Sequence, residues 1–426
     1  MYLEKGLNKI DNTTPHTPPL RPYQVDGVQK LISNFCSDKP GFLLKDEPGL
    51  GKSRQVIEAL KAVYADRVTI VAPASLLINW RKEFEKWGYL PSSLEIVSFN
   101  YCQKKVPSNI KGSVLVIDEA HFLRNIDSKQ SKNICEFASK AKKVWMLTGT
   151  PVVKGLADTF NYLLLANPKE LLEFRNFYGF ADRYAVKKIT RIGNRQVVSY
   201  ISGKNVVELR AKFAPVSFGR KKADVLKDLP EKEFFDITLN QDMSIGGEVK
   251  FTEEEILRAV ESGSVSQELM SQKRISGINK TSGAANFINS FKEPVVVFAQ
   301  HQQVVKLLSE GLVSAGKRVG VIKGGMSAID KDDVVTKFQG NDLDVVVCNI
   351  EAAGVGLTLT AARVAVFVEL PFNFSSYIQA CDRIHRIGQE NKVQIYNLLN
   401  GELDEMLVGI LKRKRLAADD FDGVEK

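Results

Sequence analysis

Residues 46–53 read DEPGLGKS, and this stretch decides the fold of the first half of the chain. It follows a short apolar run at residues 42–44 and precedes a helical pattern over residues 54–65. Gly49 and Gly51 let the backbone curl, so that amide groups converge on anionic oxygens at a helix N-terminus. A strand, a glycine-bearing turn and a helix in this order predict a phosphate cradle.

Two side chains of this stretch suit a bound nucleotide. Lys52 can reach the β- and γ-phosphates, and Ser53 can ligate Mg²⁺. The strict pattern has glycine where Asp46 stands, so the P-loop is imperfect. For the octapeptide alone, a glycine turn capped by Ser53 with a solvated Lys52 is the alternative.

The composition narrows the class of protein. The chain has 426 residues, enough for two or three domains, and 44% of them are hydrophobic. Its net charge of +9 and pI of about 9.1 favour a polyanionic partner such as nucleic acid, although charge also serves solubility. The five cysteines are scattered and never spaced as CxxC, which argues against a disulfide framework and favours a reducing compartment. No run reaches the ~18 apolar residues that span a membrane, and we expect neither a signal peptide nor a membrane partner.

Continuous apolar runs, many of them rich in β-branched residues, alternate with helical patterns in both halves of the chain. They occupy residues 42–44, 68–71, 114–117 and 144–147, then residues 295–298, 319–322, 345–348, 364–368 and 393–396. This alternation predicts an α/β protein with parallel, doubly covered sheets. Functional residues should then follow the carboxyl ends of the strands.

These patterns divide the chain into four parts. We expect an N-terminal arm at 1–19, a first lobe at 20–228 with a helical insertion at about 152–228, a connection with a second protrusion at 229–285, and a second lobe at 286–426. The insertion contains a basic stretch at 220–222 and an aromatic cluster, which we interpret as a small helical core, with a base-stacking platform as the alternative. The cluster consists of Phe174, Phe177, Tyr178, Phe180 and Tyr184.

Residues 118–121, DEAH, directly follow an apolar strand pattern. ATP hydrolysis needs Mg²⁺ to neutralise the phosphates and a group that orients water. We therefore assign Asp118 to the metal and Glu119 to the water. Because DEAH is not the HExxH zinc box, we interpret His121 as a coupling residue.

Residues 379–389, QACDRIHRIGQ, form the third element of the predicted site. Arg383 and Arg386 are three apart and Gln379 is four before Arg383, so the three are predicted to share one helical face. If the second lobe closes over the first, the arginines act as arginine fingers, which commonly accelerate hydrolysis by ~10³–10⁵. An exposed basic helix face is the alternative.

Two weaker signals complete the set. Gln24, upstream of the P-loop, carries an amide that can read a donor and an acceptor on an adenine edge; a solvated helix start is the alternative. Gly354 and Gly356 permit close backbone approach to a phosphate, or form an ordinary strand–helix turn.

Taken in order, these motifs resemble those of superfamily-two helicases, and within them the Swi/Snf-related DNA translocases. The resemblance is carried by residues 20–24, 46–53, 72–80, 118–121, 147–151, 349–360 and 379–389. It is closest to the annealing-helicase (HARP-like) branch, judged from residues 356–358 and from RIGQ at 386–389, and it covers nearly all of residues 18–412.

The resemblance implies two RecA-like parallel-sheet lobes with helical protrusions, ATP and Mg²⁺ as cofactors, and hydrolysis coupled to tracking along duplex DNA. It implies the nucleotide-binding set Gln24, Glu47, Gly49, Gly51, Lys52, Ser53, Gly356 and Gln379. It implies Ser53 and Asp118 as metal ligands, and Lys52, Asp118, Glu119, Arg383 and Arg386 as catalytic residues. It implies the DNA-facing set Ser75, Asn79, Trp80 and Thr358.

The expected partner is double-stranded or branched DNA, and the expected state is a monomer with no protein partner identified. We expect a cytoplasmic location in a bacterial or phage-infected cell, or a nuclear one if the source is eukaryotic. Pro48 departs from the family, which usually has methionine there. The alternatives are a strand-separating DNA or RNA helicase and a non-catalytic ATP-switched nucleic-acid clamp, against which Glu119, Arg383 and Arg386 argue.

Overall fold

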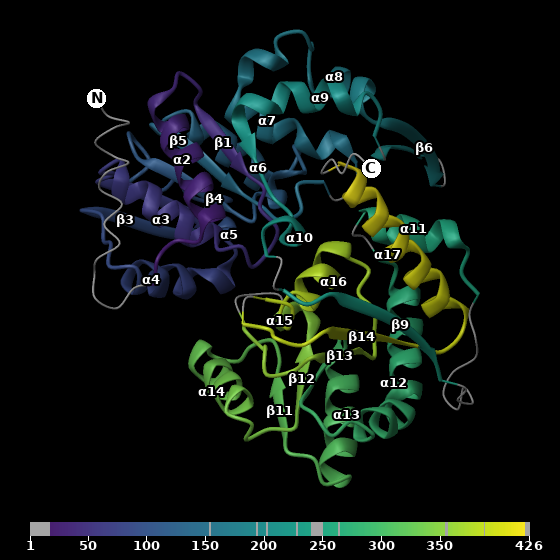
Figure 1. Ribbon diagram of the computed structural model, residues 1–426. Coiled ribbons are helices and arrows are strands. Elements are labelled where there is room, and N and C mark those ends of the chain that lie inside the picture. Colours follow the sequence, from purple (N-terminus) through teal and green to yellow (C-terminus); the bar gives the residue numbers. More distant parts are fainter. Residues whose placement is uncertain are drawn as a thin grey trace. The chain divides into compact units, whose positions relative to one another are not determined.

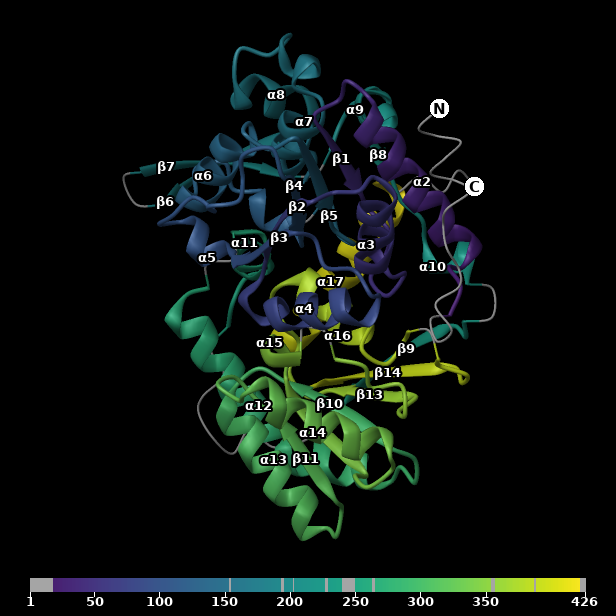
Figure 2. The same ribbon diagram turned by 90° about the vertical axis from the view of Figure 1, so that its left-hand side faces the viewer.

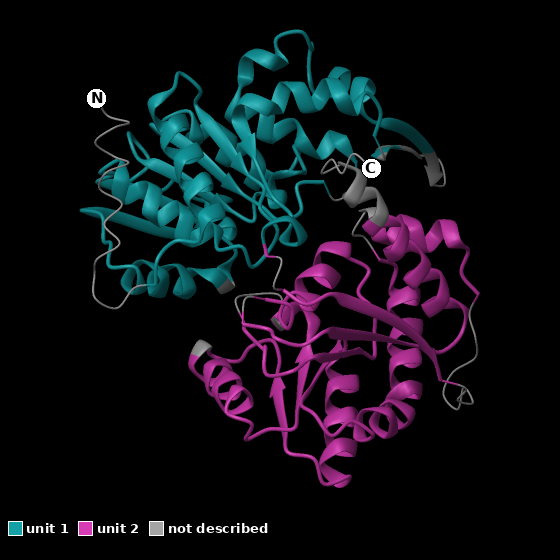
Figure 3. Ribbon diagram, viewed as in Figure 1, with its two compact units in different colours: residues 1–225 teal, residues 226–426 magenta. Residues whose placement is uncertain are grey.

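The computed structural model describes residues 18–152, 155–192, 195–201, 203–226, 229–239, 250–262, 265–353, 357–386 and 388–421. The chain divides into two compact units, Met1–Val225 and Leu226–Lys426, which Figure 3 colours separately. Within the described residues, each unit is built on one six-stranded parallel sheet with helices packed against it (Figure 1). The predicted α/β fold with two parallel-sheet lobes is therefore confirmed.

The sheet of unit 1 has the strand order β3-β2-β4-β5-β1-β8. Its strands are β1 (Gly41–Leu44), β2 (Arg67–Ala72), β3 (Ser93–Ser98), β4 (Val114–Asp118), β5 (Lys143–Leu147) and β8 (Ser217–Phe218). β1, β2, β4 and β5 are the strands predicted from sequence, whereas β3 and β8 are additional edge strands. Because β5 pairs in parallel with both β1 and β4, the loops after these three strands leave the sheet at one edge.

Helices cover both faces of this sheet, as the two views in Figures 1 and 2 show. They are α2 (Pro22–Cys36), α3 (Lys52–Ala62), α4 (Leu77–Lys86), α5 (Phe99–Cys102), α6 (Lys129–Ala138) and α7 (Phe160–Ala166). On one face, side chains of α2, α3 and α4 bury against alternate strand residues in a single core. On the other, α7 approaches β1 so closely that a Cβ on Gly41 would lie 2.6 Å from the Leu165 carbonyl oxygen.

The tryptophans of the chain all belong to unit 1. Trp145 is buried in β5 and donates its indole N–H to Asn34 Oδ1 at 3.1 Å. Trp87, at the end of α4, donates to Glu83 Oε2 at 2.6 Å. Trp80 lies within α4, is 1% exposed, and donates its indole N–H to Asp118 Oδ2 at 2.9 Å. Each indole N–H thus has a hydrogen-bond partner, as buried indoles require.

The insertion packs its own small core. Its elements are α8 (Phe177–Tyr184), the antiparallel hairpin of β6 (Val186–Ile192) and β7 (Arg195–Ile201), α9 (Val206–Phe213) and α10 (Lys222–Val225). Phe174, Phe180 and Tyr184 contact one another with ring centroids 4.8–5.7 Å apart, and the last two are fully buried. The interpretation of this cluster as a core is confirmed, although Tyr178 is 55% exposed.

The sheet of unit 2 has the order β11-β12-β10-β13-β14-β9. Its strands are β9 (Lys232–Thr238), β10 (Val295–Ala299), β11 (Val319–Ile322), β12 (Val345–Asn349), β13 (Val364–Phe367) and β14 (Val393–Leu399). β10 to β14 are the strands predicted from sequence. β9 lies in the segment expected to be a connection, yet it pairs in parallel with β14 along its whole length.

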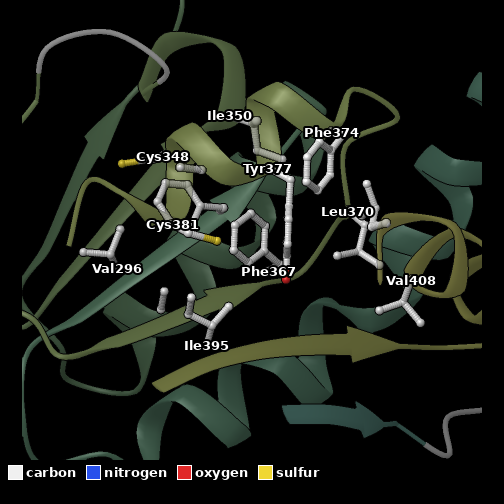
Figure 4. Close-up of a cluster of buried hydrophobic side chains, with 14 of the residues drawn as sticks. Val296, Cys348, Ile350, Phe367, Leu370, Phe374, Tyr377, Cys381, Ile395 and Val408 are labelled. Carbon is white, nitrogen blue, oxygen red and sulfur yellow. The ribbon is translucent and has the colours of Figure 1, made fainter. Parts of the chain in front are cut away.

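The helices of unit 2 also cover both faces of its sheet. They are α11 (Glu253–Ser262), α12 (Gln267–Asn289), α13 (Gln302–Ser314), α14 (Ala328–Gln339), α15 (Ile350–Ala353), α16 (Phe374–Cys381) and α17 (Glu402–Phe421). One core, shown in Figure 4, packs Phe367 of β13 against Tyr377 and Cys381 of α16. The core on the opposite face joins α12 and α13 to the sheet. Among the described helices, none is both long and apolar enough to cross a membrane.

Candidate functional site

The P-loop joins β1 to α3 through two glycines in the left-handed region. Gly49 has a φ of 91° and Gly51, the N-cap of α3, has a φ of 77°. An L side chain rarely adopts such angles, so these two positions require glycine. Lys52 and Ser53 consequently begin α3, where backbone N–H groups point at the loop. The local conformation is the one that the sequence predicted for a phosphate cradle.

The ammonium group of Lys52 lies over the loop that precedes it. Its Nζ donates to the carbonyl oxygens of Asp46 at 2.7 Å and Glu47 at 3.3 Å. The same charge lowers the pKa of Asp118, although other effects on that carboxyl are larger. The P-loop lysine and the first acid of the DEAH stretch therefore act on each other electrostatically.

Gln24 is buried beside this loop, which excludes the solvated helix start. Its Nε2 donates to the Leu50 carbonyl at 3.3 Å, and its Oε1 accepts from the Arg21 N–H at 3.1 Å. A Cβ on Gly51 would lie 2.5 Å from the Gln24 amide nitrogen, so the close fit is a second reason for glycine there. The contact of Gln24 with adenine stays a prediction.

Asp118 ends β4, and the residue is 9% exposed. Its Oδ2 accepts the Trp80 indole N–H at 2.9 Å, and its Oδ1 accepts the Glu119 backbone N–H at 2.9 Å. Burial raises the pKa of Asp118 to about 6, the charge of Glu119 adds to the rise, and the bond from Trp80 opposes it. The carboxylate is therefore aimed and held by two donors.

Glu119 has a backbone conformation that glutamate rarely adopts, with a φ of 52°. Strain of this kind persists where the surrounding contacts fix it, and it is common at functional sites. His121 supplies one contact: its Nδ1 lies 3.2 Å from Glu119 Oε2 and 3.4 Å from Thr148 Oγ1. His121 thus bridges the loop after β4 to the loop after β5, and its role as a coupling residue stays a prediction.

Pro48 of the P-loop meets the loop after β5. A Cβ on Gly149 would lie 2.5 Å from Pro48 Cδ, so glycine at 149 makes room for the proline ring. Thr148 anchors the same loop, since its N–H donates to the Leu44 carbonyl of β1 at 3.2 Å. The proline that departs from the family pattern is accommodated by a direct packing partner.

The residues expected to face DNA fall into different surroundings. Trp80 is buried, and its indole N–H donates to Asp118. The structure therefore contradicts the expectation that the Trp80 side chain faces DNA. Asn79, its neighbour on α4, is half-buried. Ser75 lies in a 3-10 turn at Ala74–Leu76, and its side chain is outside the described residues. Within this set, Trp80 has the clearest alternative role, as a support for Asp118.

In unit 2, the two arginines lie beyond a helix and not along one, so the predicted shared helical face is wrong. α16 ends at Cys381, although it does contain Gln379, and the chain continues through turns. Both guanidinium groups nevertheless converge on one carbonyl. Arg386 Nη1 donates to Leu357 O at 2.9 Å, and Arg383 Nη1 donates to the same oxygen at 3.5 Å.

The loop that these arginines hold carries another predicted residue. Arg386 Nη1 also donates to Thr358 Oγ1 at 3.1 Å. Gln389, which follows the two arginines, holds the end of the same loop, since its Nε2 donates to the carbonyl of Ala362 at 2.8 Å. Gly354 and Gly356 lie outside the described residues, so their predicted role is untested.

Sequence reasoning missed a buried cluster behind the P-loop. Asp46, which breaks the strict glycine pattern, has no exposed surface and is bonded to Gln55 and Arg220. In the sequence, Gln55 falls within the helical pattern at 54–65 and Arg220 within the basic stretch at 220–222, so neither stands out. The long sequence separation between Asp46 and Arg220 left no local signal for this contact.

The residues around the P-loop fit Mg²⁺ and a nucleotide. Asp118 offers a carboxylate and Ser53 a hydroxyl, which are the hard oxygen ligands that Mg²⁺ prefers together with phosphate oxygens and water. In the described part of the chain, no group of three or more His, Cys, Asp or Glu side chains is arranged around a metal. Such a group is not needed where substrate phosphates complete the coordination.

Models of two known domains match the sequence of the chain. A model of the SNF2-related domain matches residues 23–101 and 92–281, and a model of the helicase conserved C-terminal domain matches residues 279–388. The chain is 29% identical to the SWI/SNF-related matrix-associated actin-dependent regulator of chromatin subfamily A-like protein 1 of Xenopus laevis, over 93% of this chain and 43% of that protein. It is 27% identical to the human DNA annealing helicase and endonuclease ZRANB3, over 96% of this chain and 41% of that protein.

The chain spans less than half the length of these curated relatives. Among solved structures, it is similar to the Sulfolobus solfataricus SWI2/SNF2 ATPase core in complex with dsDNA. The sequence identity is 22% and the TM-score is 0.45, with 95% of this chain and 92% of that chain covered.

The bond from Trp80 to Asp118 generates a testable prediction. Trp80→Phe keeps most of the buried ring but removes the N–H that supports the carboxylate. A hydrogen bond to a charged group contributes roughly 1.5–3 kcal/mol, so we expect Mg²⁺-dependent nucleotide binding to weaken by about tenfold or more. The measurement is a Mg²⁺ titration of the affinity for a fluorescent ATP analogue.

Trp87→Phe is the matched control, because Trp87 donates its indole N–H to Glu83 rather than to Asp118. This variant should titrate like the parent chain. Equal Mg²⁺ dependence in both variants would show that the bond does not support metal binding.

Proposed function

The chain belongs to the SNF2-related family of nucleic-acid-dependent ATPases of helicase superfamily two, and we propose that its ATP hydrolysis drives movement along double-stranded DNA. Family membership rests on the SNF2-related match, whose two segments together run from residue 23 to residue 281 of 426. The observation that carries the proposal is the common edge of unit 1, where the P-loop and the DEAH carboxylates emerge on either side of β5.

The residues of unit 1 have distinct proposed roles at this edge. The α3 amides and Lys52 bind the terminal phosphates, with Gly49 and Gly51 allowing the approach and Glu47 shaping the loop. Ser53 and Asp118 hold Mg²⁺, which when bound neutralises phosphate charge. Glu119 orients and polarises the attacking water. His121 keeps the Glu119 carboxylate in place through its contact with Thr148.

For unit 2 we propose that Arg383 and Arg386 reach the terminal phosphates when the two units close on ATP. Guanidinium groups stabilise the charge that develops in the transition state. In the structure, both groups bond to Leu357 O, so the turn after α16 presents them together. Gln379 and Gly356 belong to the same proposed nucleotide-binding set.

Double-stranded DNA is the proposed track. The net charge of +9 favours a polyanion. Ser75, Asn79 and Thr358 are the proposed DNA-facing residues, whereas Trp80 is proposed to support the metal ligand Asp118. Similarity to a protein named a DNA annealing helicase favours branched DNA and strand annealing as a second candidate activity.

Removing the water-orienting acid tests the catalytic assignment. Glu119→Gln should reduce DNA-stimulated ATP hydrolysis by ~10²–10⁴, because an amide cannot accept the proton of the attacking water. Nucleotide binding should persist in this variant, whereas Lys52→Ala should lose both binding and hydrolysis. Phosphate release and fluorescent-nucleotide titration measure the two properties.

Glu136→Gln, an exposed change in α6, is the matched control and should keep the parent rate. Near-normal hydrolysis by purified Glu119→Gln would exclude the catalytic assignment.

The arginine proposal predicts a split between hydrolysis and binding. Arg386→Ala should lower the hydrolysis rate by ~10³ or more, as an arginine finger would, while sparing much of the nucleotide affinity. Arg386→Lys keeps a positive charge and a donor for Leu357 O but lacks the planar guanidinium group. It therefore separates the effect of losing the loop contact from the effect of losing the guanidinium group. A parallel loss of binding and hydrolysis in both variants would identify a ground-state ligand instead.

The track is tested by measuring the ATPase rate with a panel of nucleic acids. We expect duplex DNA to stimulate most, forked DNA to match it if annealing is a function, and single strands or RNA to stimulate weakly. Binding through phosphates weakens steeply with salt, by ~10³–10⁵ between 50 and 200 mM for 6–10 contacts, so the DNA concentration for half-maximal stimulation should rise with salt. Stimulation by RNA alone would replace this proposal with an RNA-directed helicase.

A further inference from the structure

The guanidinium group of Arg220 lies where three segments of unit 1 meet. Its Nε donates to Asp46 Oδ1 at 3.0 Å and its Nη2 to Asp46 Oδ2 at 2.6 Å, a bidentate pair with the P-loop. Nη2 also donates to Gln55 Oε1 of α3 at 3.1 Å, and Nη1 donates to the Tyr23 carbonyl oxygen of α2. The Arg220 side chain is only 10% exposed, so these contacts form in a nearly water-free environment.

Asp46 depends on this arginine. Its carboxylate has no exposed surface, and besides Arg220 it accepts a hydrogen bond from Gln55 Nε2 at 2.9 Å. A buried carboxylate is costly unless it is paired and hydrogen-bonded. The residue that breaks the strict P-loop pattern is therefore one half of a buried ion pair whose other half lies 174 positions away in sequence.

The backbone around Arg220 is fastened to the P-loop as well. The Arg220 carbonyl accepts the Glu47 N–H at 3.1 Å, and Glu47 Oε2 accepts the Lys222 N–H at 2.7 Å. Gly219 lies against Lys45, because a Cβ there would be 2.7 Å from the Lys45 carbonyl oxygen. The segment 217–222 is thus held against the start of the P-loop by two hydrogen bonds and by the close approach of Gly219 to Lys45.

Space for the guanidinium is built into α2. A Cβ on Gly27 would lie 1.8 Å from Gln55 Oε1 and 2.9 Å from Arg220 Nη2. Gln24, one helical turn earlier, contacts the Leu50 carbonyl of the same loop. The helix that carries the predicted adenine contact, the P-loop and α3 are therefore held together around Arg220.

We propose that Arg220 is a positioning residue that holds the P-loop and α2 in the conformation that binds nucleotide. The segment that carries it leads directly into Leu226, the first residue of unit 2. Nucleotide affinity therefore depends on how the chain that joins the two units is anchored. This inference rests on the proposed function, since it concerns the same nucleotide site.

A test must separate positioning from simple stability, because removing one partner of a buried pair leaves an unpaired charge. The double variant Arg220→Met with Asp46→Asn removes both charges while keeping similar volumes. We expect it to fold, with an unfolding temperature near that of the parent chain. Its dissociation constant for a fluorescent ATP analogue, measured without nucleic acid, should rise by at least tenfold.

Two further variants sharpen the result. Arg220→Lys keeps the charge but cannot form the bidentate pair, so its affinity should be intermediate. The matched control is Arg183→Met with Glu208→Gln, which removes a guanidinium–carboxylate pair of similar geometry from the insertion. The control should bind nucleotide like the parent chain, and in steady-state assays the KM for ATP should rise only in the Arg220 variants.

A folded double variant with nucleotide affinity and KM within twofold of the parent chain would overturn the inference and reduce Arg220 to a stabilising contact. Failure of the parent chain itself to bind or hydrolyse ATP would instead refute the proposed function.

Discussion

The carboxylate of Asp46 is the constraint on which the nucleotide loop of unit 1 depends. A charge with no exposed surface must be neutralised where it lies, and here Arg220 does so from the last segment of the unit. That one requirement brings together α2, the P-loop, α3 and the segment 217–222, which are far apart in sequence. A loop rich in glycine gains from such support, since glycine gives the backbone freedom that other contacts must remove.

The three loops at the edge of the first sheet form one connected body. Lys52 acts on Asp118 through its charge, Pro48 packs against Gly149, and His121 joins Glu119 to Thr148. The strained backbone of Glu119 is held inside this body. A displacement of any one loop would therefore reach Glu119, the acid proposed to orient water, as the proposed coupling of hydrolysis to movement requires.

Much of the fold could be predicted because buried parallel strands appear in the sequence as continuous apolar runs. β3 and β9 were not predicted, because these edge strands carry polar and charged residues, such as Glu95 in β3 and Asp236 in β9. The P-loop and DEAH stretch were recognisable because their chemistry is local. The supports were not: Trp80 meets Asp118 across 38 residues, and the turn that follows α16 at Cys381 overrode the helical spacing of Arg383 and Arg386.

The confinement of all tryptophans to unit 1 has an optical consequence. Excitation of indole in the intact chain reports only on the half that contains the P-loop. Trp80 is bonded to the carboxylate assigned to Mg²⁺, while Trp87 and Trp145 bond to Glu83 and Asn34. The protein thus carries a native fluorophore that is hydrogen-bonded to the acid proposed to bind Mg²⁺, and two others with different partners.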